Sequence, residues 1–273
     1  MKNFLKCKVC SSNFRPINKK YQLVKCDNCS LVFSENIFSE TEIIQTYDKL
    51  YNKTDQYKQH INEFENLKLK KQVNLGRARR KIFKFLLSKN IKEVCEIGSG
   101  VGIVANFFQD KKINYLGIEL DKSTAQRAQS LGFNVVNESF THLANFNSKF
   151  DTLVGFEVIE HIQDLEAFFK LAVQSIIPKG YLGFTVPNYD KIKNYKNVGD
   201  HLHQDIPPIH LNFFTVENLT KILDFYGFEI EFLEAKKIPY LNFSNLETYR
   251  LLWNALLGKF QGQTILCVAR RKV

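Results

Sequence analysis

Residues 93–102 read Glu-Val-Cys-Glu-Ile-Gly-Ser-Gly-Val-Gly, and this stretch decides the fold. A short apolar run ends in the acid Glu96, and glycines then follow at every second position, at Gly98, Gly100 and Gly102. Glycine lets the backbone approach a ligand that side chains would hold away. At the carboxyl end of a strand in an open α/β sheet, such a turn lies where ligands bind. The stretch therefore predicts a strand, a ligand-binding turn and a helix.

The spacing of these glycines separates two nucleotide-binding motifs. The dinucleotide fingerprint Gly-x-Gly-x-x-Gly would need a glycine at position 103, which is Ile103. The form Glu-x-Gly-x-Gly-x-Gly instead resembles motif I of the class I S-adenosylmethionine (SAM) methyltransferases. The resemblance implies that Glu96 pairs with the ammonium of the methionine moiety, and that amides of the turn take its carboxylate. A tight strand-to-helix turn without a ligand is the alternative.

Apolar runs alternate with amphipathic ones from residue 91 onward, which predicts a doubly wound parallel sheet. The expected strands are residues 93–97, 115–120, 134–136, 152–156, 181–186, 229–233 and 264–269. The expected helices lie near residues 101–110, 123–131, 164–177 and 216–226, the last capped by Thr215. This order predicts a seven-stranded, mostly parallel, Rossmann-like methyltransferase sheet with helices on both faces, spanning residues 91–273.

Polar residues at the ends of the expected strands are candidates for holding a nucleoside. Glu119 ends the second strand about twenty residues past the glycine turn, where a carboxylate can accept both ribose hydroxyls. An exposed acid at a strand end is the alternative. By the resemblance, Glu138 and Ser139 occupy the place that contacts the adenine ring, and Phe156 at the end of the fourth strand is a further cofactor-binding residue.

Four of the six cysteines form two Cys-x-x-Cys pairs separated by 15 residues: Cys7, Cys10, Cys26 and Cys29. That spacing predicts a zinc ribbon over residues 1–38. Its zinc is expected to be structural, because four thiolates leave no open coordination position. Disulfides are the alternative, but nothing in the sequence indicates a secreted protein. Cys95 and Cys267 lie in apolar runs and are expected to be buried as small hydrophobic residues.

The ribbon resembles an N-terminal module of bacterial methyltransferases that modify surface polysaccharides and their nucleotide-sugar precursors. The resemblance rests on the run Cys26-Asp-Asn-Cys29-Ser-Leu-Val-Phe33, with Ser30 in place of the usual glycine, and on the spaced Tyr47 and Tyr51. The tyrosines either pack in the core or contact SAM or substrate. The resemblance implies O-methylation of a sugar or nucleotide-linked sugar in capsule or lipopolysaccharide biosynthesis. Sugar C-methyltransferases are an alternative, although those with a similar ribbon carry an extra C-terminal domain.

The segment Glu157-Val-Ile-Glu160-His161 supplies candidates for the acceptor side. It closely resembles the segment after strand four in ubiquinone-pathway O-methyltransferases. The small-RNA 2′-O-methyltransferases use the same residues, with a later histidine that here is His210, to hold a divalent ion against a vicinal diol. The set Glu157, Glu160, His161 and His210 thus forms either a Mg²⁺ or Mn²⁺ site, a metal-free general base at one histidine, or a structural support for the loop over SAM.

Charge is concentrated before the glycine turn. The chain has a formal net charge of +10, and residues 1–90 carry 19 Lys and Arg against 8 Asp and Glu. The densest basic run, residues 68–81, lies in the helical linker expected at 39–90. It is either a solvated helix face or a surface for a polyanion. An RNA methyltransferase is therefore the second functional hypothesis, and a non-enzymatic module with an inactive cofactor fold is the third.

Two long connections complete the expected organisation. Residues 188–214 contain His201 and His203, weaker catalytic candidates, and are expected to cover the substrate as a lid. Residues 238–262 are rich in leucine and aromatic residues and predict an amphipathic helix that packs on the sheet or forms an oligomer. Without a signal peptide or a stretch of ~18 apolar residues, a cytoplasmic location without a membrane span is expected.

Overall fold

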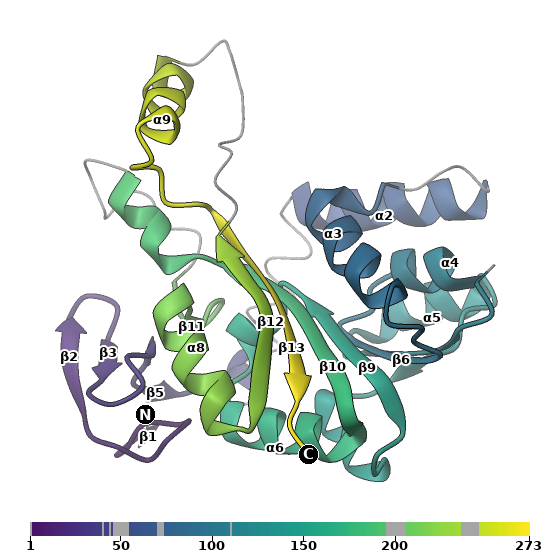
Figure 1. Ribbon diagram of the computed structural model, residues 1–273, viewed down its shortest axis with the longest axis horizontal. Coiled ribbons are helices and arrows are strands. Elements are labelled where there is room, and N and C mark those ends of the chain that lie inside the picture. The colour runs from purple at the N-terminus through teal and green to yellow at the C-terminus, as the bar shows by residue number, and fades with distance from the viewer. Residues whose placement is uncertain are drawn as a thin grey trace.

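The computed structural model describes residues 2–39, 41–43, 45, 55–69, 74–109, 111–194, 206–235 and 246–273. A seven-stranded sheet with the order β12-β13-β10-β9-β6-β7-β8 runs through its centre (Figure 1). Its strands are β6 (Glu93–Ile97), β7 (Asn114–Glu119), β8 (Val135–Asn137), β9 (Phe150–Phe156), β10 (Ile176–Pro187), β12 (Phe228–Ala235) and β13 (Thr264–Arg271). Strand β13 runs antiparallel to both of its neighbours, β10 and β12, and every other pair of neighbouring strands in this sheet is parallel. The predicted α/β sheet is thereby confirmed.

Helices cover both faces of this sheet, because alternate strand residues point into two separate cores. Within β6, Val94 packs with α3 (Gly76–Leu87) and α4 (Ile103–Gln109). The next residue, Cys95, packs on the opposite face, in the cluster that includes α6 (Leu165–Ser175) and α8 (Val216–Phe225). Cys95 and Cys267 are fully buried, which confirms their expected place in the core.

The helix boundaries follow from local signals. Asp121 caps α5 (Lys122–Ser130) by accepting a hydrogen bond from the Thr124 amide. The predicted cap of α8 is confirmed, because Thr215 accepts from the Asn218 amide while the Asn218 side chain accepts from the Thr215 amide. The helix expected near 164–177 ends at Ser175, because the longer strand β10 already begins at Ile176.

The N-terminal segment forms a second, four-stranded sheet with the order β11-β4-β3-β2. Three of its strands come from the ribbon: β2 (Phe14–Asn18), β3 (Leu23–Cys26) and β4 (Val32–Ser34). The fourth, β11 (Asn212–Phe213), comes from the connection expected to be a lid and pairs antiparallel with β4. Asn212 and Phe213 are 2% and 5% exposed, so this end of the connection is a buried part of the ribbon sheet. A short ladder joins β1 (Lys2–Asn3) to β5 (Asn36–Ile37).

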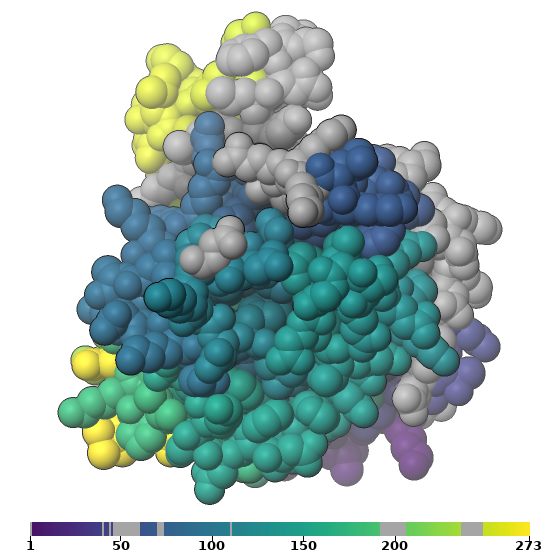
Figure 2. All heavy atoms as spheres, turned by 90° about the vertical axis from the view of Figure 1, so that its right-hand side faces the viewer, coloured from purple at the N-terminus to yellow at the C-terminus, as the bar shows by residue number. Residues whose placement is uncertain are grey.

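The basic linker contributes two helices beside the glycine turn. Helix α2 (Asp55–Lys68) packs Phe64 and Leu67 against Val101 and Ile103, at the start of α4. Figure 2 looks onto this side of the molecule, where α2 and α3 lie above the residues of α4 and α5. Tyr47 and Tyr51, expected in the same linker, lie outside the described residues.

Helix α9 (Leu246–Leu256) stands at the extremity of the molecule in both views (Figures 1 and 2). Leu251 is buried, whereas Trp253 and Leu256 are 63% and 80% exposed. The predicted helix is therefore present, but the described part of it does not lay its whole apolar surface on the sheet. Within the described ranges, no helix has the length and apolar character needed to cross a bilayer.

Candidate functional site

The glycine turn sits at the carboxyl end of β6, and all three of its glycines have left-handed backbone conformations. Their φ angles are +70° at Gly98, +56° at Gly100 and +92° at Gly102. A Cβ atom at Gly98 would lie 2.5 Å from a methyl carbon of Val158, and one at Gly102 would lie 2.4 Å from the ring of Phe133. Conformation and space therefore both require glycine at these two positions.

Replacing Gly102 with alanine is expected to lower the free energy of unfolding by about 2–4 kcal/mol, from left-handed strain and from overpacking against Phe133. Gly132→Ala is the matched control, because Gly132 also has a positive φ, of +80°, but a Cβ there would meet nothing within 4 Å. Denaturation in urea measures both variants. Equal losses in the two would show that the contact with Phe133 contributes nothing.

Glu119 ends β7 with its carboxylate beside the turn. Its Oε2 accepts a hydrogen bond from the Gly100 amide at 2.9 Å, and its Oε1 accepts one from the Asp121 amide at 2.8 Å. The residue is only 8% exposed, and burial raises the pKa of its carboxyl. An ionised carboxylate offers about four acceptor positions. The two positions that the amides leave could accept the two hydroxyls of a ribose.

Glu96 is the second buried acid of this site. It is 2% exposed, and the hydroxyl of Tyr115 donates a hydrogen bond to its Oε2. Burial raises the pKa of Glu96 to about 8, although the Tyr115 hydrogen bond and the positive charge of Arg79 act in the opposite direction. At neutral pH the free protein therefore holds Glu96 mainly in its protonated form. A cationic ligand beside it would favour ionisation.

Arg79 is a candidate site residue that sequence reasoning missed. Its guanidinium carbon lies 5.1 Å from the centre of the Phe156 ring, and its charge acts on Glu96. Phe156 itself is buried and packs edge-on against Phe83 of α3. The missed signal was helical spacing: Arg79 lies three and four residues before the buried Ile82 and Phe83, so it faces the core, unlike a solvated basic residue.

Glu138 and Ser139 follow β8 at the same edge of the sheet. The amide of Glu138 donates to the Glu119 carbonyl at 3.1 Å, and its side chain is exposed. Ser139 caps the 3₁₀ helix η1 (Phe140–Asn145) by accepting a hydrogen bond from the Thr141 amide. The backbone of Glu138 thus adjoins Glu119, and contact of Glu138 or Ser139 with an adenine ring stays a prediction.

A second group of polar side chains follows β9. The 3₁₀ turn η2 (Ile159–His161) brings Glu160 and His161 to His210, and one ligand atom of each lies within 4.8 Å of the others. Glu160 is 1% exposed, and its Oε1 lies 3.8 Å from Nε2 of His161. The rings of His161 and His210 meet edge to face with centres 4.7 Å apart. The sequence predicted these three residues together, and the structure brings them together.

Glu157, the fourth residue of that predicted set, is not part of the group found among the described residues. It has a φ of +58° and an exposed side chain, while its amide donates to the Thr185 carbonyl. Glu157 thus has a left-handed conformation where the chain passes from β9 to η2. His201 and His203 lie outside the described residues.

The orientation of His161 follows from its backbone contact. Its Nδ1 lies 2.7 Å from the carbonyl oxygen of Ile209. Because a carbonyl can only accept, Nδ1 carries the hydrogen, and the lone pair of the neutral ring is on Nε2, toward Glu160. A histidine whose second nitrogen donates to a carbonyl is the usual arrangement of a metal ligand. An imidazole held in this tautomer can equally accept a proton at Nε2.

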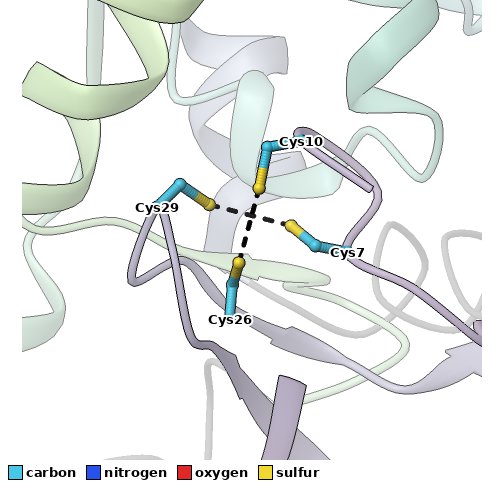
Figure 3. Close-up of side chains that lie close together, drawn as sticks. All are labelled: Cys7, Cys10, Cys26 and Cys29. Carbon is cyan, nitrogen blue, oxygen red and sulfur yellow. Dashed lines mark hydrogen bonds between the residues drawn. The ribbon is translucent and has the colours of Figure 1, made fainter. Parts of the chain in front are cut away.

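The four ribbon cysteines point toward one common centre (Figure 3). The Sγ atoms of Cys7 and Cys29 are 3.7 Å apart, and those of Cys10 and Cys26 are 3.5 Å apart. All four are free thiols, so the disulfide alternative does not apply to them. Four sulfurs around zinc at about 2.3 Å would be separated by nearly 3.8 Å. The cysteine cluster therefore has the size and donor set that a structural zinc ion requires.

Two curated methyltransferases are similar to this chain over about half of its length. A malonyl-[acyl-carrier protein] O-methyltransferase of Calditerrivibrio nitroreducens is 27% identical over 146 residues, which cover 52% of this chain and 54% of that protein. A "Probable S-adenosylmethionine-dependent methyltransferase" of Mycolicibacterium smegmatis is 25% identical over 142 residues, covering 51% and 53%. The chain spans about half the length of the curated relatives it matches.

The chain is also similar to a solved structure and to a protein-family model. The SAM-dependent methyltransferase from Archaeoglobus fulgidus superposes with a TM-score of 0.56 at 20% identity, covering 76% of this chain and 97% of that one. That likeness shows the fold. Residues 56–232, which include the glycine turn, Glu119 and the Glu160–His161 turn, match a family model described as a methyltransferase domain. The chain therefore belongs to this family of methyltransferase domains.

Proposed function

We propose that the protein transfers a methyl group from SAM to an oxygen of a small polar acceptor, such as a sugar or nucleotide-linked sugar used for a surface polysaccharide. One observation carries the proposal. The carboxyl ends of neighbouring strands bring two sets of side chains to one edge of the sheet: the turn with Glu96 and Glu119, and the group of Glu160, His161 and His210. The first set suits the cofactor, and the second suits an acceptor.

The charged groups of the cofactor side support SAM as the ligand. Glu119 would accept the ribose hydroxyls at the positions that the amides of Gly100 and Asp121 leave. The methionine moiety carries an ammonium and a carboxylate. The positive charge of Arg79 acts on Glu96, so an acid and a base are both available to complement that pair of opposite charges. The glycines let the turn approach the ligand closely.

The acceptor side would prepare a hydroxyl for attack on the methyl group. Glu160, His161 and His210 offer the oxygen and nitrogen donors that Mg²⁺ or Mn²⁺ binds, and a bound ion would polarise a sugar hydroxyl whose own pKa is too high for ionisation at neutral pH. Without an ion, Nε2 of His161 would accept the proton as a general base. In both cases the Ile209 carbonyl fixes the ring.

Removal of divalent ions is expected to abolish methyl transfer while SAM affinity changes less than about twofold, because Glu160, His161 and His210 are not among the residues expected to bind SAM. The measurement compares turnover before and after treatment with EDTA, with restoration by Mn²⁺ and with the zinc content checked in the same sample. Full turnover in protein free of added divalent ions would eliminate the ion and leave His161 as the base.

The same proposal assigns a structural zinc ion to Cys7, Cys10, Cys26 and Cys29. A segment this short is below the size at which a domain usually folds on its own core, so a metal would supply much of its folding free energy. Apolar residues of the ribbon, including Val9, Leu31 and Phe33, are buried in one cluster with residues of α6 and α8. Zinc would thus stabilise a part of the protein that is continuous with the methyltransferase core.

The contacts of three of the five basic side chains of α3 favour a small acceptor over RNA. Lys81 pairs with Glu234, Arg80 hydrogen-bonds to Asn74, and Arg79 lies over Phe156. These groups are engaged within the protein, whereas RNA binding by contacts to phosphate needs basic side chains turned toward the ligand.

A transfer screen with radiolabelled SAM tests the acceptor class. Nucleotide sugars, glycan extracts, RNA and malonyl-acyl carrier protein are offered in parallel, the last because a curated relative is named for that acceptor. The proposal expects label in the sugar fractions. Label in RNA that declines steeply with added salt would overturn the acceptor class and support the RNA hypothesis.

A further inference from the structure

We propose that Asn212 is the positioning residue of the acceptor side, and that it couples the zinc ribbon to the turn that carries Glu160 and His161. The inference rests on the function proposed above for that turn. In this proposal the ribbon has a second role besides folding: it holds Glu160 and His161 in position.

The first observation is the set of contacts that Asn212 makes. Its side-chain nitrogen donates to the carbonyl oxygens of Ile159 at 3.0 Å and Ile162 at 2.7 Å, with Glu160 at 3.4 Å. The carbonyls of Ile159 and Glu160 belong to η2, and Ile162 is the residue directly after it. A single amide group thus joins both ends of the turn that presents Glu160 and His161.

The turn needs such support because it is short. A three-residue 3₁₀ helix has little stability of its own, and its geometry depends on what surrounds it. The neighbouring backbone adds a second tie, since the Leu211 amide donates to the Glu160 carbonyl at 2.8 Å. The group that faces the acceptor is therefore fixed from β11.

The second observation is that the side-chain oxygen of Asn212 is buried and accepts no hydrogen bond from the described residues. A buried acceptor without a donor lowers stability, and an apolar side chain of similar size would avoid that cost. Core packing alone does not account for asparagine at this position. The donated hydrogen bonds to the turn do.

The third observation is that β11 is held by the ribbon. Asn212 pairs with Phe33 of β4, and the Ser34 amide donates to the Leu211 carbonyl at 3.0 Å. Strand β4 follows Cys29 by three residues, and the neighbouring β3 ends at Cys26. Two of the four thiols that would hold zinc therefore lie on the hairpin to which β11 is added.

Direct contacts reinforce this connection from the ribbon to the residues after the turn. The Lys8 ammonium donates to the carbonyl of Gln163 at 3.2 Å, and the Gln163 side chain hydrogen-bonds to both the amide and the carbonyl of Phe38. A change in the ribbon would thus reach Glu160 and His161 through short, partly buried contacts. The glycine turn has no part in these contacts.

The test uses the full zinc-loaded chain and the variants Asn212→Ala and Asn212→Ser. Asn218→Ala is the matched control, because Asn218 is also a fully buried asparagine and donates to the other residue of β11, Phe213, without contacting the turn. Histidine-ring NMR reports the tautomer of His161, Mn²⁺ titration reports the ion site, and calorimetry reports SAM affinity.

The proposal expects Asn212→Ala to lose the fixed Nδ1–H tautomer of His161 and to bind Mn²⁺ about tenfold or more weakly, with SAM affinity within about twofold of the parent. Asn212→Ser keeps one smaller donor and should show the same changes to a lesser extent. It serves as the test if Asn212→Ala fails to fold. The control should keep both signals. An unchanged tautomer in the Asn212 variants, or equal loss in the control, would overturn the proposal.

In a second experiment, zinc is removed from the parent chain and amide hydrogen exchange is measured. Protection at Ser34 and Leu211 should fall, whereas Gly98, which donates to the Ile118 carbonyl, should stay protected. Equal protection at Leu211 with and without zinc would contradict the coupling. If the parent chain binds no Mn²⁺, the ion site proposed above fails, while the tautomer and exchange measurements still decide the role of Asn212.

Discussion

Glu119→Ala is expected to weaken SAM binding by about a hundredfold or more. Each hydrogen bond from a ribose hydroxyl to an ionised carboxylate contributes roughly 1.5–3 kcal/mol, and the variant loses two of them. It also leaves the Gly100 amide without its carboxylate partner, so the turn loses a tie that shapes it. Calorimetric titration of SAM into the purified variant measures the change.

Two further variants make this result interpretable. Glu119→Gln keeps one acceptor oxygen and should fall between the parent and the alanine variant. Glu93→Ala removes an acid at the opposite end of the sheet, where Glu93 pairs with Lys149, and should bind SAM as the parent does. Parent-like affinity in Glu119→Ala would refute the ribose assignment.

SAM affinity is expected to rise nearly a hundredfold between pH 5.5 and pH 7.5. Burial raises the pKa of Glu96 to about 8, so below that pH the ammonium of SAM must displace a proton from the carboxyl. Over this range affinity rises almost tenfold per pH unit, and an α-amino group stays cationic. Calorimetry in buffers of different ionisation enthalpy should report release of nearly one proton on binding.

The same pKa makes a prediction for the free protein. A carboxyl whose folded-state pKa is raised contributes stability below its unfolded pKa, and that contribution is lost as the pH rises toward 8. The free energy of unfolding should therefore fall as the pH rises from 4.5 to about 8, and bound SAM should offset this loss of stability. Glu96→Gln should remove both pH dependences. If the glutamine variant still releases a proton on binding SAM, Glu96 is not its source.

Much of the cofactor side follows from local sequence. The turn at Gly98–Gly102 and the acid Glu119 are specified within short segments, because a strand that ends in a glycine-rich turn leaves few conformations open. The structure adds that Gly98 and Gly102 also contact Val158 and Phe133 closely. Those contacts join distant segments, and spacing within one segment cannot specify them.

The acceptor side was less completely predictable from the sequence. Glu160, His161 and His210, which the resemblance grouped, do lie close together, whereas Glu157, which it also included, is not in that group and has a left-handed conformation. The pairing of β11 with the ribbon could not be predicted from sequence periodicity either. A two-residue strand has no periodicity to detect, and its partner lies about 180 residues away in the chain.

The central claim is that SAM binds at the glycine turn, and glycine-specific ¹⁵N NMR tests it most directly. The chain has 13 glycines, so each can be followed separately during a titration with SAM. The amide signals of Gly98, Gly100 and Gly102 should shift and saturate, while those of Gly132, Gly227 and Gly258, which lie in other turns, should stay in place. Saturating SAM that leaves the three turn signals unmoved would contradict the account.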